Sequence, residues 1–313
     1  EGVRLCHCAG PDMMYIEDTG NHDVRTEGMS YAMMFCVQMN RQKEFDCLWR
    51  WVVTHMYLTE GENAGYFAWS CHTDGSKNSD GPAPDGEEFF AMSLFFAANR
   101  WGSGEGVLDY ASWARRILHA CVHKGEEAGS GFPMWNPENH LIKFVPNCEF
   151  TDPSYHLPHF YELFALWSDE CDRPFWHAAA AASRQYLRKA CHARTGLSAE
   201  YAEYDGRPHR GDQPDRHDWF FSDAYRTLGN IALDAQWFGD KDGWAQETAA
   251  HIQQFFEEKE HGQTNGIYLI DGTPVEGNAL HPVGLLATIA QGSLILDDAC
   301  ADEWLRRFFS TPL

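Results

Sequence analysis

Acidic residues stand at the start of several apolar segments of this 313-residue chain, and they are the first sign of chemistry. Glu27 precedes the apolar run 29–39, Asp85 precedes EEFFAMSLFF, Asp152 lies in TDPSYHLP, and Asp223 lies in FFSDAYR. Glycoside hydrolysis needs two carboxyl groups, one to protonate the leaving oxygen and one to activate water or attack the anomeric carbon. Carboxyl groups from distant segments of the chain could supply such a pair.

The surroundings of two of these residues favour different roles for them. Glu27 opens the segment that looks most buried, and burial or a neighbouring carboxylate raises a carboxyl pKa, as a general acid requires. Asp223 follows two phenylalanines and Ser222 at a junction between loop and helix, where a base could reach water. Candidate sugar-binding side chains flank the same segments: Arg25, Tyr66, Trp69, Trp135, Tyr155 and Arg226.

Two kinds of helical segment must position these residues. Segments that are apolar all round are expected to be buried, and they are 26–39, 87–99, 154–168, 222–238 and 282–296. Segments with a one-sided apolar stripe are 43–57, 107–123, 174–192, 243–258 and 301–309. The two kinds alternate along the chain, and the only strand signals are short, at 141–150 and 267–275.

This alternation predicts an all-α fold, a toroid of inner and outer helices in one catalytic domain over residues 1–313. Five helices of each kind are one pair short of an (α/α)6 barrel, so we expect the chain to be truncated at one or both ends. Inner helices that enter from the same end would bring Glu27, Asp85, Asp152 and Asp223 to one face. The alternative is that each is a helix cap, since carboxylates are favoured at helix N-termini.

Composition excludes some classes of partner. The net charge of −22 argues against binding to nucleic acid. The chain contains no run of 18 apolar residues, so we expect no membrane-spanning helix. The ten cysteines contain no C-x-x-C pair and predict free thiols in a reducing compartment, so we expect the protein in the cytoplasm. We also expect a monomer. We expect no cofactor and no metal: His156 and His159 are interpreted as packed or surface side chains, and His209 and His217 as solvated.

The motifs DVRTEGMSYAMM, YFAWSCHTDGSKNSDGPAPDGEEFF, FTDPSYHLPHFYELFALW and FFSDAYR resemble glycoside hydrolase family 8 over roughly residues 10–300. This resemblance implies an (α/α)6 barrel and inversion of the anomeric configuration. It also implies that Glu27 is the general acid and Asp223 the general base. Asp85 would bind and distort the sugar at the cleavage point, and Tyr155 would hold the attacking water.

Within the family, the chain is most similar to the reducing-end xylose-releasing exo-oligoxylanases. The stretch Ala279-Leu280-His281-Pro282 resembles the loop that blocks the cleft beyond one leaving-group sugar in that subgroup. His281 is the candidate for binding the reducing-end hydroxyl of a xylo-oligosaccharide. Two alternatives remain open: an endo-acting β-1,4-xylanase or β-glucanase of the same family, and a non-catalytic carbohydrate-binding relic.

Overall fold

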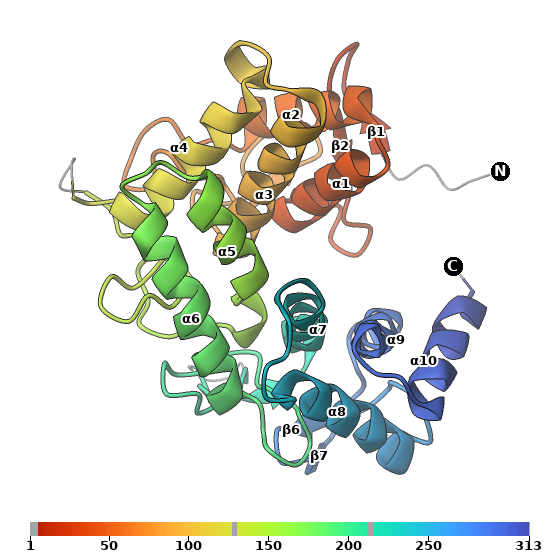
Figure 1. Ribbon diagram of the computed structural model, residues 1–313. Coiled ribbons are helices and arrows are strands. Elements are labelled where there is room, and N and C mark those ends of the chain that lie inside the picture. The colour runs from red at the N-terminus through yellow and green to blue at the C-terminus, as the bar shows by residue number, and fades with distance from the viewer. Residues whose placement is uncertain (1–5, 127–129, 212–215, 313) are drawn as a thin grey trace. The chain divides into compact units, whose positions relative to one another are not determined.

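The structure is a computed structural model that describes residues 6–126, 130–211 and 216–312 (Figure 1). Its contacts divide the chain into two compact units. Unit 1 comprises Glu1–Pro137, Val145–Cys148 and Leu163–Phe175, and unit 2 comprises Glu138–Phe144, Glu149–Glu162 and Trp176–Leu313.

Unit 1 contains two small antiparallel sheets and four helices (red to yellow in Figure 1). The sheets pair β1 (Cys6–Cys8) with β2 (Met14–Ile16) and β3 (Asp23–Arg25) with β4 (Ser70–His72). The helices are α1 (Thr26–Gln38), α2 (Gln42–His55), α3 (Pro84–Trp101) and α4 (Tyr110–His123), with a 3-10 turn, η1 (Gly106–Leu108), before α4.

The helices of unit 1 form the predicted consecutive hairpins, because α1 packs on α2 and α3 packs on α4. The two segments predicted to be inner helices, α1 and α3, also pack on each other. Gly86 makes their close approach possible: a Cβ at this position would lie 2.5 Å from the Cβ of Thr26. The first turns of α1 and α3 therefore touch, which sets Glu27 and Asp85 on neighbouring turns.

The prediction that the helix is buried on every side is correct for most of α3 but wrong for α1. Nearly all side chains of α3 are buried, from Pro84 to Ala97. In α1, Met29 and Met33 are buried, whereas Phe35 is 67% exposed. An apolar composition all round therefore does not by itself identify a helix that is buried all round.

Unit 2 holds the C-terminal helices and one three-stranded antiparallel sheet of order β5-β6-β7. The strands are β5 (Trp219–Phe220), β6 (Ile267–Leu269) and β7 (Pro274–Val275). The helices are α7 (Arg226–Phe238), α8 (Trp244–Glu260), α9 (Pro282–Gln291) and α10 (Ala299–Ser310), with the 3-10 turns η2 (Pro153–Tyr155), η3 (Ser222–Tyr225) and η4 (Gly292–Leu294). Helices α5 (Pro158–Trp167) and α6 (Arg173–Ala190) each have residues in both units.

Packing in unit 2 repeats the pattern of unit 1. Helix α7 packs on α8, α9 packs on α10, and α7 also packs on α9. Their shared core includes Leu228, Phe256, Leu285, Ile289 and Trp304, each at most 3% exposed. The predicted pairing of an apolar helix with the striped helix that follows it is thus confirmed for α1 with α2, α3 with α4, α7 with α8 and α9 with α10.

The structure differs from the predicted elements where proline interrupts a pattern. The segment 154–168 splits into η2 and α5, because Pro158 lacks an N–H and disfavours helical geometry at Leu157. The predicted strand at 141–150 is wrong: Cys148 N donates to the carbonyl oxygen of Val145 in a turn that contains Pro146. The predicted strand segment 267–275 is confirmed as the β6–β7 pair.

Among the described helices, none combines the length and the apolar composition needed to cross a bilayer.

Candidate active site

Glu27 and Asp85 lie in the first turns of α1 and α3, but neither is a helix cap. The N-cap position of α1 is Arg25, in extended conformation, and that of α3 is Ala83, and neither helix start has a side-chain capping hydrogen bond. Asp85 is 3% exposed, and its Oδ1 accepts a hydrogen bond from Gly86 N at 3.0 Å. The capping alternative is therefore wrong for both residues.

A third carboxyl group, Glu87, belongs to this cluster. It is fully buried, and its Oε1 accepts a hydrogen bond from Phe67 N at 3.0 Å. Burial raises the Glu87 pKa well above its usual value, and the charges of Asp85 and Glu27 raise it further, against the opposing hydrogen bonds from backbone N–H groups. A protonated Glu87 avoids a third negative charge beside Glu27 and Asp85.

Arg25 and Trp69 flank the start of α1 through the β3–β4 pair. Thr26 N donates to the carbonyl oxygen of Trp69 at 3.0 Å, so the first residue of α1 is tied to the end of the loop before β4. The Arg25 guanidinium carbon lies 5.2 Å from the centroid of the Trp69 ring, and Arg25 Nε lies 3.0 Å from Asp23 Oδ1. The cation and the half-buried indole thus lie next to the turn that carries Glu27.

Tyr66 and Trp135 are placed differently from the prediction. Tyr66 is fully buried, and its hydroxyl donates to the carbonyl oxygens of Ala120 and Phe132, at 3.1 and 2.9 Å. Trp135 is 1% exposed. We therefore assign Tyr66 to the core of unit 1 rather than to a sugar contact, and the burial of Trp135 gives a sugar no access to its ring.

In unit 2, η3 presents Asp223 beside Arg226. Ser222 has φ of 45°, a left-handed conformation that is costly for a residue other than glycine and is often found at functional sites. The start of η3 has no side-chain capping hydrogen bond, so Asp223 is not a cap either. Its side chain is 45% exposed, which gives water access to the carboxylate.

Arg226 links Asp223 to Tyr155. The Arg226 Nη2 lies 3.3 Å from Asp223 Oδ1, and its guanidinium carbon lies 5.6 Å from the centroid of the Tyr155 ring. The backbone of Tyr155 is held in place by Tyr161, whose hydroxyl donates to the Tyr155 carbonyl oxygen at 3.1 Å. Asn230 of α7 donates to the carbonyl oxygen of Ser154 at 2.7 Å and fixes η2 against α7.

Asp152 does act as a cap, so the structural alternative is correct for this residue. Its Oδ1 accepts a hydrogen bond from Ser154 N at 2.7 Å and closes η2. The side chain is fully buried, and burial followed by the charge of Asp223 raises its pKa well above the usual value, while Arg226 opposes the rise. Asp152 also supports Tyr155 directly, because its carbonyl oxygen accepts a hydrogen bond from Tyr155 N at 3.0 Å.

Glu200 is a member of the site that the sequence did not reveal. Burial, then the charge of Asp223, raises its pKa to about 8, against a backbone hydrogen bond from Asp223 and the charge of Arg226. His217 Nδ1 lies 2.8 Å from Glu200 Oε2, so the prediction that His217 is merely solvated is wrong. Both residues lie in the loop region 193–221, where no periodic pattern marks a buried side chain.

His281 occupies the N-cap position of α9. Its φ of −128° and ψ of 71° are non-helical, as Pro282 at the first helical position predicts. Leu285 N donates to the carbonyl oxygen of His281 at 2.9 Å, while the neighbouring Leu280 is 54% exposed. The loop therefore presents an apolar and an imidazole side chain just before the helix.

The structure thus groups the predicted residues into two sets. Glu27, Asp85, Arg25 and Trp69 lie around the starts of α1 and α3 in unit 1. Tyr155, Asp223 and Arg226 lie around η2, η3 and the start of α7 in unit 2, together with Asp152 and Glu200. The convergence of the two sets stays a prediction.

Comparison with known proteins gives a consistent result. The family described as "Glycosyl hydrolases family 8" matches residues 12–296. A "Reducing end xylose-releasing exo-oligoxylanase" of Halalkalibacterium halodurans is 56% identical over 313 residues, 99% of this chain and 79% of that protein. One of the same name from Bifidobacterium adolescentis is 55% identical over 308 residues, 96% of this chain and 79% of that protein.

A solved structure supports the same relationship. The structure of Rex8A from Paenibacillus barcinonensis complexed with xylose is 55% identical, with a TM-score of 0.96, over 100% of this chain and 82% of that chain. The match confirms the predicted all-α, (α/α)6 class of fold.

Proposed function

Because this chain belongs to glycosyl hydrolases family 8, we propose that it is an inverting hydrolase that releases xylose from the reducing end of β-1,4-xylo-oligosaccharides. The observation that carries the proposal is the identity of 55% and 56%, over nearly the whole chain, to two proteins named for that activity. The family match covers residues of both units, which supports one catalytic domain.

In the proposed mechanism, Glu27 is the general acid. It donates a proton to the glycosidic oxygen as the bond to the leaving xylose breaks. Its place in the first turn of α1, beside the turn that carries Asp85, and the family match over its motif support this role. Asp85, on the adjoining helix turn, is proposed to bind the sugar at the cleavage point.

Asp223 is the proposed general base. Inversion requires a water molecule on the face of the sugar opposite the leaving group, and the base removes a proton from it as it attacks. The 45% exposure of the Asp223 side chain supports access of water, and Arg226 stabilises the carboxylate. We propose that the Tyr155 hydroxyl holds this water, since Arg226 contacts both residues.

Sugar recognition is assigned to side chains at the edges of the two sets. Trp69 offers an indole face to the C–H face of a sugar ring, and Arg25 donates hydrogen bonds to hydroxyl groups. His281 is proposed to bind the free hydroxyl of the reducing-end xylose, which would restrict the leaving group to one sugar. This restriction separates the exo-acting from the endo-acting proposal.

Xylotriose and polymeric xylan test the proposal against both alternatives. The expected result is xylose plus xylobiose from xylotriose, with little release of oligomers from xylan. Internal cleavage of xylan to mixed oligomers would instead support the endo-acting enzyme. Binding of xylotriose without any product would support the non-catalytic relic.

The proposed location stays the cytoplasm, and the proposed state a monomer. The ten cysteines form no disulfide in the part of the chain that the structure describes, which is compatible with a reducing compartment.

A further inference from the structure

Two histidines and one aspartate gather at the C-terminal end of α4, among residues that the proposed reaction does not use. His119 and His123 are four residues apart on one helix, and both face Asp172. His119 Nδ1 lies 3.2 Å from Asp172 Oδ2, and His123 Nε2 lies 2.8 Å from Asp172 Oδ1. The three ligand atoms lie within 4.8 Å of one another.

We propose that His119, His123 and Asp172 bind a divalent transition-metal ion, with Zn²⁺ as the best match. Histidines at i and i+4 present both rings on one helix face, and two imidazoles plus one carboxylate are typical zinc ligands. Such a set leaves the fourth tetrahedral position for water. An ion here would join the end of α4 to the connection between α5 and α6.

His123 also has a carboxylate partner on its other ring nitrogen. Its second ring nitrogen, Nδ1, lies 2.8 Å from Glu126 Oε2. When Nδ1 donates to Glu126, the lone pair of Nε2 is available to a metal ion, and Nε2 lies 2.8 Å from Asp172 Oδ1. Histidine ligands of metals commonly have such a carboxylate partner, which fixes the tautomer and ring orientation.

The Asp172 side chain is buried next to the two histidines. Its side chain is 1% exposed, so the carboxylate is shielded from solvent and needs cationic or donor partners on the protein side. The two histidines, 39% and 28% exposed, lie between it and an open pocket of about 520 Å³. An ion could reach the three ligands from this pocket.

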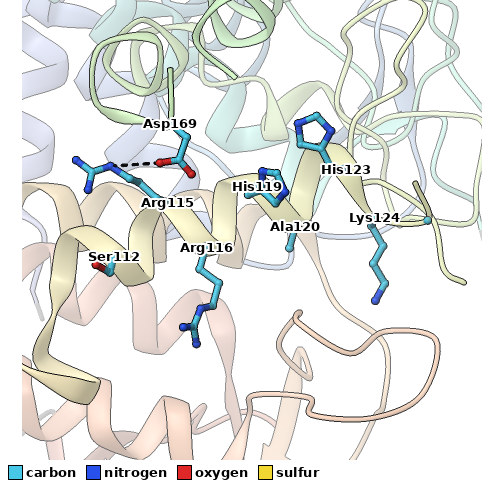
Figure 2. Close-up of a pocket in the computed structure, with 9 residues that line it drawn as sticks. Ser112, Arg115, Arg116, His119, Ala120, His123, Lys124 and Asp169 are labelled. Atoms are coloured by element: carbon cyan, nitrogen blue, oxygen red, sulfur yellow. Dashed lines mark ion pairs between the residues drawn. The ribbon is translucent and has the colours of Figure 1, made fainter. Parts of the chain in front are cut away.

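Three cations also line the pocket, and each has a contact of its own. Arg115 Nε lies 3.8 Å from Asp169 Oδ1, Arg116 stacks on Trp113 at 4.7 Å, and Lys124 Nζ donates to the carbonyl oxygen of Ala64 at 2.6 Å. Figure 2 shows Arg116 and Lys124 extending away from His123. The alternative occupant of the pocket, an inorganic anion bound by these cations, is distinguished by the test.

The test is a calorimetric titration of chelator-treated full-length protein with ZnCl₂, followed by the absorption spectrum with Co²⁺. We expect one equivalent of Zn²⁺ to bind and a tetrahedral Co²⁺ spectrum to appear. His119→Gln should abolish both, and Glu126→Gln should weaken Zn²⁺ binding by about 10–100-fold. His119 is partly exposed, so its substitution should leave the fold intact, which circular dichroism would check.

His22→Gln is the matched control, because His22 also pairs with a carboxylate, at 3.0 Å from Glu17. It should bind Zn²⁺ like the unmodified protein. Absence of Zn²⁺ binding would overturn the proposal, as would binding that survives His119→Gln or is lost in His22→Gln. Inorganic phosphate that binds the metal-free protein and prevents Zn²⁺ uptake would show that the pocket is an anion site instead.

Discussion

Arg226 Nη2 lies 3.3 Å from Asp223 Oδ1, and the same guanidinium lies over the ring of Tyr155. One cation therefore orients both the proposed base and the residue proposed to hold the attacking water. Asp152 and Glu200 complete the polar set of unit 2. The charge of Asp223 raises the pKa of both groups, and the charge of Arg226 opposes this rise.

Replacement of either catalytic carboxyl group should reduce turnover strongly. Glu27→Ala and Asp223→Ala are each expected to lower kcat on xylotriose by roughly 10²–10⁴-fold, because a positioned acid or base contributes that much. Asp205→Ala is the control: Asp205 is an exposed aspartate that also pairs with an arginine, Arg207 at 2.8 Å. Near-normal kcat in the Glu27 or Asp223 variant would remove that residue from the mechanism.

The stereochemistry of the product tests the role of Asp223 as a base rather than a nucleophile. An attacking water on the far face of the sugar inverts the anomeric centre. Xylotriose should therefore yield α-xylobiose first, which NMR spectra recorded before mutarotation would reveal. Initial appearance of the β-anomer would mean retention and would exclude the proposed role of Tyr155.

The raised pKa of Glu200 should make stability depend on pH. A folded-state pKa of about 8 lies above the usual glutamate value of 4.5, so Glu200 stabilises the fold below pH 4.5 and this contribution is lost as pH rises through about 8. Across this window, the protein should lose stability relative to Glu200→Gln, with a slope of at most about 1.4 kcal/mol per pH unit.

Chemical denaturation at a series of pH values measures this difference. Glu203→Gln is the matched control, because Glu203 pairs with His209 at 2.7 Å but is 40% exposed. The free energy of unfolding of Glu203→Gln should change with pH in the same way as that of the unmodified protein. If the free energy of unfolding changes with pH in the same way for Glu200→Gln and the unmodified protein, Glu200 is ionised over the whole range from pH 4.5 to about 8 and its pKa is not raised.

The helices were largely predictable because their core faces are periodic. Segments 107–123, 174–192 and 243–258 correspond closely to α4, α6 and α8, whose apolar stripes repeat at helical spacing. The short strands, such as β3 and β4, were missed, because three residues are too few to establish an alternating pattern.

The candidate site was predictable only where a chemical motif lies at a helix start. Glu27, Asp85 and Asp223 were found in this way. Glu200 was missed because it lies in a loop, where its burial and its neighbour Asp223 depend on tertiary structure. Tyr66 was predicted to be a sugar contact and is now assigned to the core, because an aromatic residue near a motif can belong to either.

Tyr66→Phe separates these two roles. Loss of its hydroxyl removes the hydrogen bond to the Phe132 carbonyl oxygen, while the Ala120 carbonyl oxygen keeps Lys124 N as a donor. This should cost about 0.5–1.5 kcal/mol of unfolding free energy. The kcat and KM on xylotriose should stay within about twofold, since no sugar contact is lost. Trp69→Ala should behave in the opposite way, with a raised KM and little change in stability. A raised KM in Tyr66→Phe without loss of stability would restore it as a sugar contact.

The end of the substrate from which xylose is released is the central claim, and an isotope label tests it most directly. Xylotetraose with ¹³C at the anomeric carbon of its reducing end would be hydrolysed, and the products of the initial-rate period analysed by mass spectrometry. We predict labelled xylose and unlabelled xylotriose, because the 280–282 loop and His281 would accept only one sugar as leaving group. Unlabelled xylose with labelled xylotriose, or labelled xylobiose, would contradict the account.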